Sequence, residues 1–155
     1  MNIERYAYLG MFKGCTALTS VPNLPATNLD LWCYDEMFAG CTSLSTVPTN
    51  LLSAASSIPF WGYKYMFSGC TSLQNAPSLP ATSLAVACYL GMFKGCASLT
   101  SAPALSVTNI TEQCYQQMFH GCTSLSTAPA LPATTLATQC YQQMFSGCTA
   151  LTAAP

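Results

Sequence analysis

Ten cysteines are the side chains of this sequence with the most obvious chemical potential. They fall into two patterns, one with cysteine before tyrosine and one with cysteine after glycine. The first set is Cys33, Cys88, Cys114 and Cys140, and the second is Cys15, Cys41, Cys70, Cys96, Cys122 and Cys148. Thiolates bind zinc, but zinc sites use ligand pairs two to four residues apart. Here Cys140 and Cys148 are eight residues apart, so neither a metal site nor a cofactor is expected.

An even number of cysteines also raises the question of disulfides. A helix between Cys140 and Cys148 would separate their Cα atoms by ~12 Å at a rise of about 1.5 Å per residue. A disulfide needs Cα atoms within about 7 Å. Between neighbouring repeats, cysteines after glycine could approach the strand spacing of about 4.8 Å, so one or two bridges remain open. The preferred interpretation is a buried slot of free thiols, because free cysteine behaves as a small hydrophobe. Ala7 and Gly62 take the place of the first cysteine in two repeats.

Catalytic constellations are not found. His120 is the only histidine, and its equivalents in the other repeats are Lys13, Ala39, Ser68, Lys94 and Ser146. A histidine without a constant partner does not look like a general base. No serine–histidine–aspartate set, carboxylate pair or glycine-rich phosphate loop occurs, and the sequence therefore predicts a protein that is not an enzyme.

Charge and hydropathy exclude two other classes of function. Only 6% of residues are charged and the net charge is −1, whereas a nucleic-acid-binding protein needs clustered basic residues. No uninterrupted apolar run approaches the roughly 20 residues of a membrane-spanning helix. The first ten residues, MNIERYAYLG, contain no apolar core of a signal peptide, although a longer parent protein could have lost one by processing.

The organisation of the chain follows from its Met-Phe pairs, which are spaced 26, 29, 26, 26 and 26 residues apart. They begin at residues 11, 37, 66, 92, 118 and 144. Self-similarity at such periods indicates a solenoid. We expect one repeat domain over residues 1–155, with repeats at about 3–28, 29–57, 58–83, 84–109, 110–135 and 136–155.

Each repeat is predicted to contain a helix of about ten to twelve residues. Counting from the first apolar residue of a repeat, apolar residues occur at offsets 0, 4, 5, 8 and 9, which share one face of a helix. Polar residues that suit a helix N-cap come just before this segment: Asn28, Ser57, Ser83, Asn109 and Thr135. A glycine two residues after each phenylalanine is expected to end the helix.

A short strand is predicted after each glycine. The segments CTSLTSAP and its variants carry one leucine per repeat and end in proline, which cannot donate to a sheet. Helices alternating with short strands imply an α/β solenoid with a parallel sheet on one face. We place the three extra residues of the longer repeat in the loop TNLLSAASSIPFW, because Trp61 then aligns with Trp32 and Tyr63 with Tyr34.

The segment MFSGCTSLSTAPALP resembles the repeating unit of BspA-type leucine-rich repeats, AF-x-x-C-x-x-L-x-x-I, over essentially the whole chain. The chain departs from that pattern in repeat length, in methionine for alanine, and in the added Cys-Tyr and proline positions. The resemblance implies a curved, leucine-rich-repeat-like solenoid with strands on its concave side. It also implies a binding or adhesive role in a bacterial surface or secreted protein, and hence an extracellular or cell-surface location.

Two surfaces are candidates for function. Nearly all charged residues fall at helix offsets expected to face solvent away from the core. The strand side instead carries small polar residues, either as a solvated sheet face or as a recognition surface for a protein or glycan. This candidate binding face consists of Thr19, Ser20, Ser45, Thr46, Gln74, Asn75, Thr100, Ser101, Ser126 and Thr127.

The two ends of the array are the second candidate. Solenoids usually protect their last repeats with polar caps, and here apolar residues are expected to be partly bare at both ends. The candidate stacking residues are Ile3, Tyr8, Met11, Leu151 and Ala154. Either the chain continues in a longer array or its ends dock, and copies that stack head to tail form an open filament.

Overall fold

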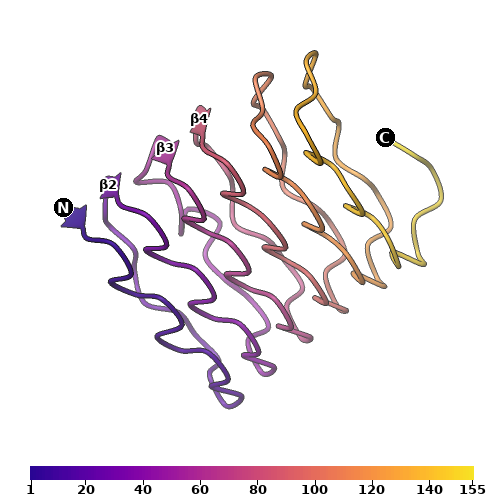
Figure 1. The fold of residues 1–155 in the computed structure, drawn as a ribbon. Helices are drawn as coiled ribbons and strands as arrows, with labels where there is room; N and C mark the ends of the chain where they lie inside the picture. Colours follow the sequence, from indigo (N-terminus) through magenta and orange to yellow (C-terminus); the bar gives the residue numbers. More distant parts are fainter.

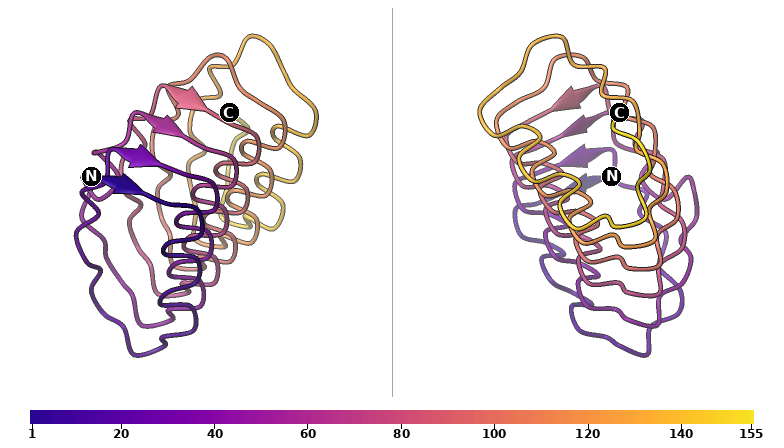
Figure 2. Two further views of the ribbon diagram at one scale, coloured as in Figure 1. Left: turned by 60° about the vertical axis from the view of Figure 1, so that its left-hand side comes forward. Right: turned by 90° about the vertical axis from the view of Figure 1, so that its right-hand side faces the viewer.

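The computed structural model describes all 155 residues as a stack of six coils, one for each repeat, with the two termini at opposite ends of the stack (Figure 1). When the stack is turned to bring one of its ends toward the viewer, each coil is seen as an elongated loop (Figure 2). One long side of the loop is the segment that carries the Cys-Tyr and Met-Phe pairs. The other side carries the leucine and proline positions.

Short parallel strands hold neighbouring coils in register. β1 (Asn2–Ile3) pairs with β2 (Asn28–Leu29), and β3 (Ser57–Ile58) pairs with β4 (Ser83–Leu84). An isolated parallel bridge joins Asn109 to Thr135 at the same place in later coils. The paired residues occupy equivalent positions of successive repeats, which confirms the in-register solenoid.

The predicted helices are wrong. In the second coil, the N–H groups of Met37 and Ala39 donate to the carbonyl oxygens three residues back, at 3.2 and 3.0 Å, forming successive turns. The alternate N–H groups leave the coil: Phe38 donates to Met66 at 2.9 Å and Gly40 to Ser68 at 2.7 Å. The same alternation recurs in the first, third, fourth and fifth coils. Half of the backbone donors in this segment therefore bind the next coil, which a helix would not allow.

The apolar spacing explains why this segment forms turns. Pairs such as Cys33–Tyr34 and Met37–Phe38 recur every four residues, and a left-handed residue also recurs every fourth position. In the second coil these are Trp32, Glu36 and Gly40, with φ of 54°, 55° and 74°. A positive φ at the third residue is the conformation of a type II turn, and such residues interrupt an α-helix.

The spacing between coils explains why this segment forms turns rather than a helix. Phenylalanine rings of successive coils stack with centroids 5.5 to 5.9 Å apart. A helix is about 10 to 12 Å wide with its side chains, so helices could not follow one another at this distance. The turn ribbon keeps both the ring stack and the hydrogen bonds between coils.

The strands also lie elsewhere than predicted. Asn28, Ser57 and Ser83, expected as helix caps, are the first residues of β2, β3 and β4. The other two expected caps, Asn109 and Thr135, form the isolated bridge. In the predicted strand region, only one parallel bridge forms, between Ser101 and Thr127. The solenoid is therefore leucine-rich-repeat-like, but it lacks helix-plus-strand coils.

The core consists of columns of identical side chains along the stack. Tyrosine, methionine, phenylalanine, cysteine and leucine each form one column, and the phenylalanines of the inner four coils are fully buried. Tryptophans 32 and 61 stack at 4.6 Å with 5° between ring planes, and Tyr34 lies 5.7 Å from Tyr63. These contacts confirm that the insertion precedes Trp61. Its Leu51 and Leu52 are buried.

Candidate functional site: a polar face, a charged strip and two end faces

All ten residues of the candidate binding face are exposed or half-buried. Backbone hydrogen bonds between coils align them. The Gln74 N–H donates to Ser45 at 2.9 Å, Thr100 donates to Gln74 at 3.4 Å, and Ser126 donates to Thr100 at 3.4 Å. The stack thus presents one polar pair in each of its first five coils along a single line.

Asn75 is the best-anchored side chain of this face. Its Nδ2 donates to the Val47 carbonyl at 2.8 Å, and its Oδ1 accepts from the Val47 N–H at 3.2 Å. A shallow depression of about 200 Å³ lies beside the face, where Pro77, Pro80 and Pro103 are among its lining residues. Because proline fixes its own φ, this part of the surface is preformed.

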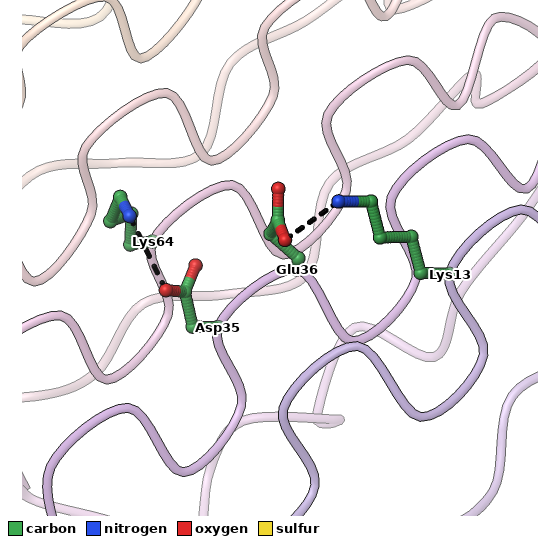
Figure 3. Close-up of polar contacts among 4 residues, drawn as sticks. All are labelled: Lys13, Asp35, Glu36 and Lys64. Carbon is green, nitrogen blue, oxygen red and sulfur yellow. Dashed lines mark hydrogen bonds and ion pairs between the residues drawn. The ribbon is translucent and has the colours of Figure 1, made fainter. Parts of the chain in front are cut away.

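A charged strip crosses the turn side of the first coils (Figure 3). Lys13 pairs with Glu36 at 2.8 Å, and Lys64 pairs with Asp35 at 3.4 Å. Asp35 was expected on the solvated outer face but is only 4% exposed. Burial raises the pKa of the Asp35 carboxyl, and nearby Lys64 opposes this rise. Its Oδ1 has no hydrogen-bond partner, so this carboxylate is costly to hold ionised.

His120 lies on the same side of the stack. Its Nδ1 is 2.8 Å from the Ser146 carbonyl oxygen, so the neutral ring carries its proton on Nδ1 and donates there. Partial burial, with a smaller effect from Lys94, lowers the pKa of the His120 ring. No carboxylate orients it. The histidine links two coils, as the lysines of its column do elsewhere.

Nine of the ten cysteines are buried, as expected, and all ten are free thiols. No three potential metal ligands gather at one point. The cysteines after glycine have a role that the sequence did not reveal: five of these six thiols donate to a phenylalanine carbonyl of the preceding coil, and only Cys15 makes no such bond. The pairs are Cys41–Phe12, Cys70–Phe38, Cys96–Phe67, Cys122–Phe93 and Cys148–Phe119, at 3.0 to 3.1 Å. The signal was the presence of this cysteine in all six repeats.

The cysteines before tyrosine have no such partner. The Cys33 sulfur is 3.9 Å from the Gly62 carbonyl, and the Cys88 and Cys114 sulfurs are 3.8 Å apart. Burial raises the pKa of the Cys33 thiol to about 12. Burial also raises the pKa of the Cys88 thiol, so at Cys33 and Cys88 the reactive thiolate is disfavoured and the side chain mainly fills space.

The end faces agree only partly with expectation. Met11 is 58% exposed and Ala154 is exposed, while Tyr8 and Leu151 are half-buried. Ile3 was expected to be bare, but it is 6% exposed because it lies in β1 against β2. The sequence reasoning missed Leu136, which is 67% exposed, while its equivalents in the other coils are buried or half-buried.

These features define a leucine-rich-repeat solenoid. The family model for the BspA type leucine rich repeat region matches six copies, over residues 3–124 and 63–154. The chain belongs to this family.

A solved structure of a leucine-rich repeat protein from Bacteroides ovatus is similar, with 24% sequence identity and a TM-score of 0.47. The match covers 82% of this chain and 30% of that one, so this chain spans less than a third of its length. A comparison with curated proteins gives no match. The structure contains no helix with the length and apolarity needed to cross a bilayer.

Proposed function

We propose that this repeat scaffold binds a protein or glycan through its candidate binding face and thereby serves adhesion at a bacterial surface or in secreted form. The supporting observation is the exposed line of uncharged polar pairs, held in place by hydrogen bonds between coils. Leucine-rich repeats generally mediate protein binding, and the BspA type is typical of surface and secreted proteins.

The chemistry of the face favours an uncharged polar ligand. Hydroxyl and amide groups donate and accept hydrogen bonds, and no charged residue belongs to the ten that form the face. Ligand binding should therefore depend little on salt, since screening weakens mainly interactions between charges.

The test is binding of the purified chain to a panel of immobilised glycans and extracellular matrix proteins. Thr100→Arg and Ser126→Arg place bulky charge on the face and should abolish binding to any ligand found. Glu112→Arg changes charge at an exposed residue outside the face and should retain it. Equal binding by all three variants would contradict the assignment of ligand binding to this face.

A second candidate function is end-to-end stacking into a filament. Six large apolar residues are exposed, and five of them belong to the first and last coils: Met1, Tyr6, Leu9, Met11 and Leu136. Light scattering over a concentration series tests this function. A particle mass that stays at one chain at every concentration would remove it.

A further inference from the structure

We propose that a depression on the turn side of the first four coils binds a short saccharide that carries one carboxylate. The depression has a volume of about 410 Å³, and its lining includes Glu36, Gly40, Tyr65, Ser68 and Lys94. A volume in this range is typical of sites for small molecules, which span roughly 300 to 1,000 Å³. No residue of the candidate binding face lines the depression, so this is a separate site with a different chemistry.

A gap in one column of side chains creates the depression. Lys13, Ala39, Ser68 and Lys94 occupy equivalent positions in the first four coils. The two short side chains in the middle leave room between the two lysines, which stand at the ends of the depression. Three coil steps separate these lysines along the stack, or ~14 Å at the strand spacing of about 4.8 Å. A span of this length suits a short oligosaccharide rather than an isolated ion.

The floor and one wall of the depression are preformed. Gly40 has a φ of 74°, which glycine adopts readily, and a Cβ there would lie 3.7 Å from the Gly14 Cα. The floor is therefore backbone stacked on backbone, without side chains. Tyr65 forms the wall, and its ring lies against the backbone of Gly91, where an added Cβ would be 2.1 Å from the Tyr65 Cε1.

The charges around the depression do not cancel. Glu36 pairs with Lys13 at 2.8 Å (Figure 3). Lys94 has no carboxylate partner, and its ammonium group donates to the neutral Gln117 Oε1 at 3.0 Å. Two lysines and one glutamate give the lining one net positive charge, whereas the whole chain carries −1. An ammonium group without a counter-ion favours a carboxylate, which accepts charge-assisted hydrogen bonds from it.

The remaining groups favour a saccharide over an acidic peptide. The hydroxyls of Tyr65 and Ser68 make no hydrogen bond within the chain, and the Glu36 carboxylate can accept more than its bond from Lys13. Tyr65 also combines an apolar ring with a polar tip, which suits the alternating C–H and hydroxyl groups of a sugar. A ligand with several negative charges would be repelled by Glu36.

The first experiment titrates the isotope-labelled chain with sialyllactose, which carries one carboxylate, and with lactose, its uncharged part. We expect sialyllactose to shift the NMR amide signals of Gly40, Ser68 and Lys94. It should bind about tenfold more tightly than lactose or better, the typical effect of one hydrogen bond to a charged group. Added salt should weaken sialyllactose binding, because the Lys94 side chain is only half-buried.

The second experiment uses variants to separate charge from shape. Lys94→Ala removes the cation without a counter-ion and should weaken sialyllactose binding by about tenfold or more. Ser68→Gln keeps every charge but fills the depression and should abolish binding. Its fold should persist, because longer side chains occupy this column at Lys13 and His120. Arg5→Ala is the matched control, since it removes an exposed cation that does not line the depression, and it should bind as the parent does.

Four results would overturn the inference. The first is that neither saccharide binds, and the second is that lactose binds as tightly as sialyllactose. The third is undiminished binding by Ser68→Gln, which would reduce the site to attraction by Lys94 alone. The fourth is a tetraglutamate peptide that binds more tightly than sialyllactose, which would assign the depression to acidic peptides. None of these variants alters the candidate binding face, so each result leaves that proposal standing.

Discussion

The two cysteine columns of this solenoid are chemically identical side chains with different roles. In the column after glycine, Cys96 donates to the Phe67 carbonyl at 3.1 Å, and four further coils repeat this bond. In the column before tyrosine, the side-chain hydrogen-bond partner of the Cys88 sulfur is another sulfur, that of Cys114, at 3.8 Å. In the column after glycine the thiol donates a hydrogen bond between coils, and in the column before tyrosine it mainly fills space in the core.

The difference accounts for the variation along the repeat. A slot that needs only volume accepts other small residues, and Ala7 and Gly62 occupy it in two coils. A slot that needs a donor keeps cysteine in every coil. The residue types found at one position across the six repeats therefore indicate whether that position requires a hydrogen-bond donor or only a small side chain.

Alkaline pH should produce the largest effect and should affect both columns. Burial raises the pKa of Cys33 and of Cys70, one from each column, from 9.0 to about 12. The folded state thus keeps protons that the unfolded state loses above pH 9. Stability should be constant below about pH 9 and fall between pH 9 and 12, by about 1.4 kcal/mol per pH unit for each such thiol.

Urea unfolding at pH 8, 9, 10 and 11 measures this fall. Buried tyrosines such as Tyr34, whose pKa burial also raises, should steepen it above pH 10. The variant Cys33→Ala is the control and should reduce the slope. A free energy of unfolding that is unchanged up to pH 11 would contradict the prediction.

Gly62→Ala should have the next largest effect on stability. It tests how much space is available at the position before tyrosine in the third coil. A Cβ at Gly62 would lie 2.9 Å from the Ile58 Cγ2 and 3.0 Å from the Pro59 Cδ. Ile58 is buried and Pro59 is rigid, so neither can yield easily. We expect a loss of about 2 to 3 kcal/mol from overpacking, measured by chemical denaturation. Ala7→Gly, in the same slot of the exposed first coil, is the control, and an equal loss there would refute the steric account.

Substitutions at Cys88 test whether its slot lacks a hydrogen-bond acceptor. Cys88→Ala removes one buried heavy atom, whereas Cys88→Ser buries a hydroxyl group whose one neighbouring acceptor is the Cys114 sulfur, a weak acceptor. An unsatisfied buried polar group costs about 1 to 3 kcal/mol, so we expect serine to be worse than alanine by about 2 kcal/mol. Thermal and urea unfolding of both variants measure the difference. Serine equal to or better than alanine would show an acceptor that the distances do not indicate.

Much of the architecture was predictable from the sequence, because repetition reports directly on stacking. The period, the register of Trp32 on Trp61 and the buried thiols followed from aligning the repeats. The local conformation did not follow. Apolar pairs at Cys33–Tyr34 and Met37–Phe38 fit a helical face, yet their period of four is that of the turn ribbon, and left-handed residues such as Trp32 and Glu36 carry no clear sequence signal.

The candidate sites were predictable to a similar degree. Exposure of the polar face followed from its composition, since a pair of uncharged polar residues recurs at the same place in five of the six coils. Burial of Asp35 did not follow, because it depends on the turn geometry that the helical interpretation replaced.

The smallest predicted effect contrasts alanine and serine at Cys96. A serine hydroxyl in this slot keeps a donor beside the Phe67 carbonyl, whereas alanine removes it. The carbonyl would still accept the Cys70 N–H at 3.1 Å, so it is not left unpaired, and only the net value of one hydrogen bond is lost. We expect Cys96→Ser to be more stable than Cys96→Ala by about 1 kcal/mol, the reverse of the order at Cys88. At Cys15 the thiol has no carbonyl acceptor in the structure. The free energies of unfolding in urea of Cys15→Ser and Cys15→Ala should therefore not differ measurably. If the serine and alanine variants have the same order of stability in both columns, the thiols of the two columns do not differ in the way proposed.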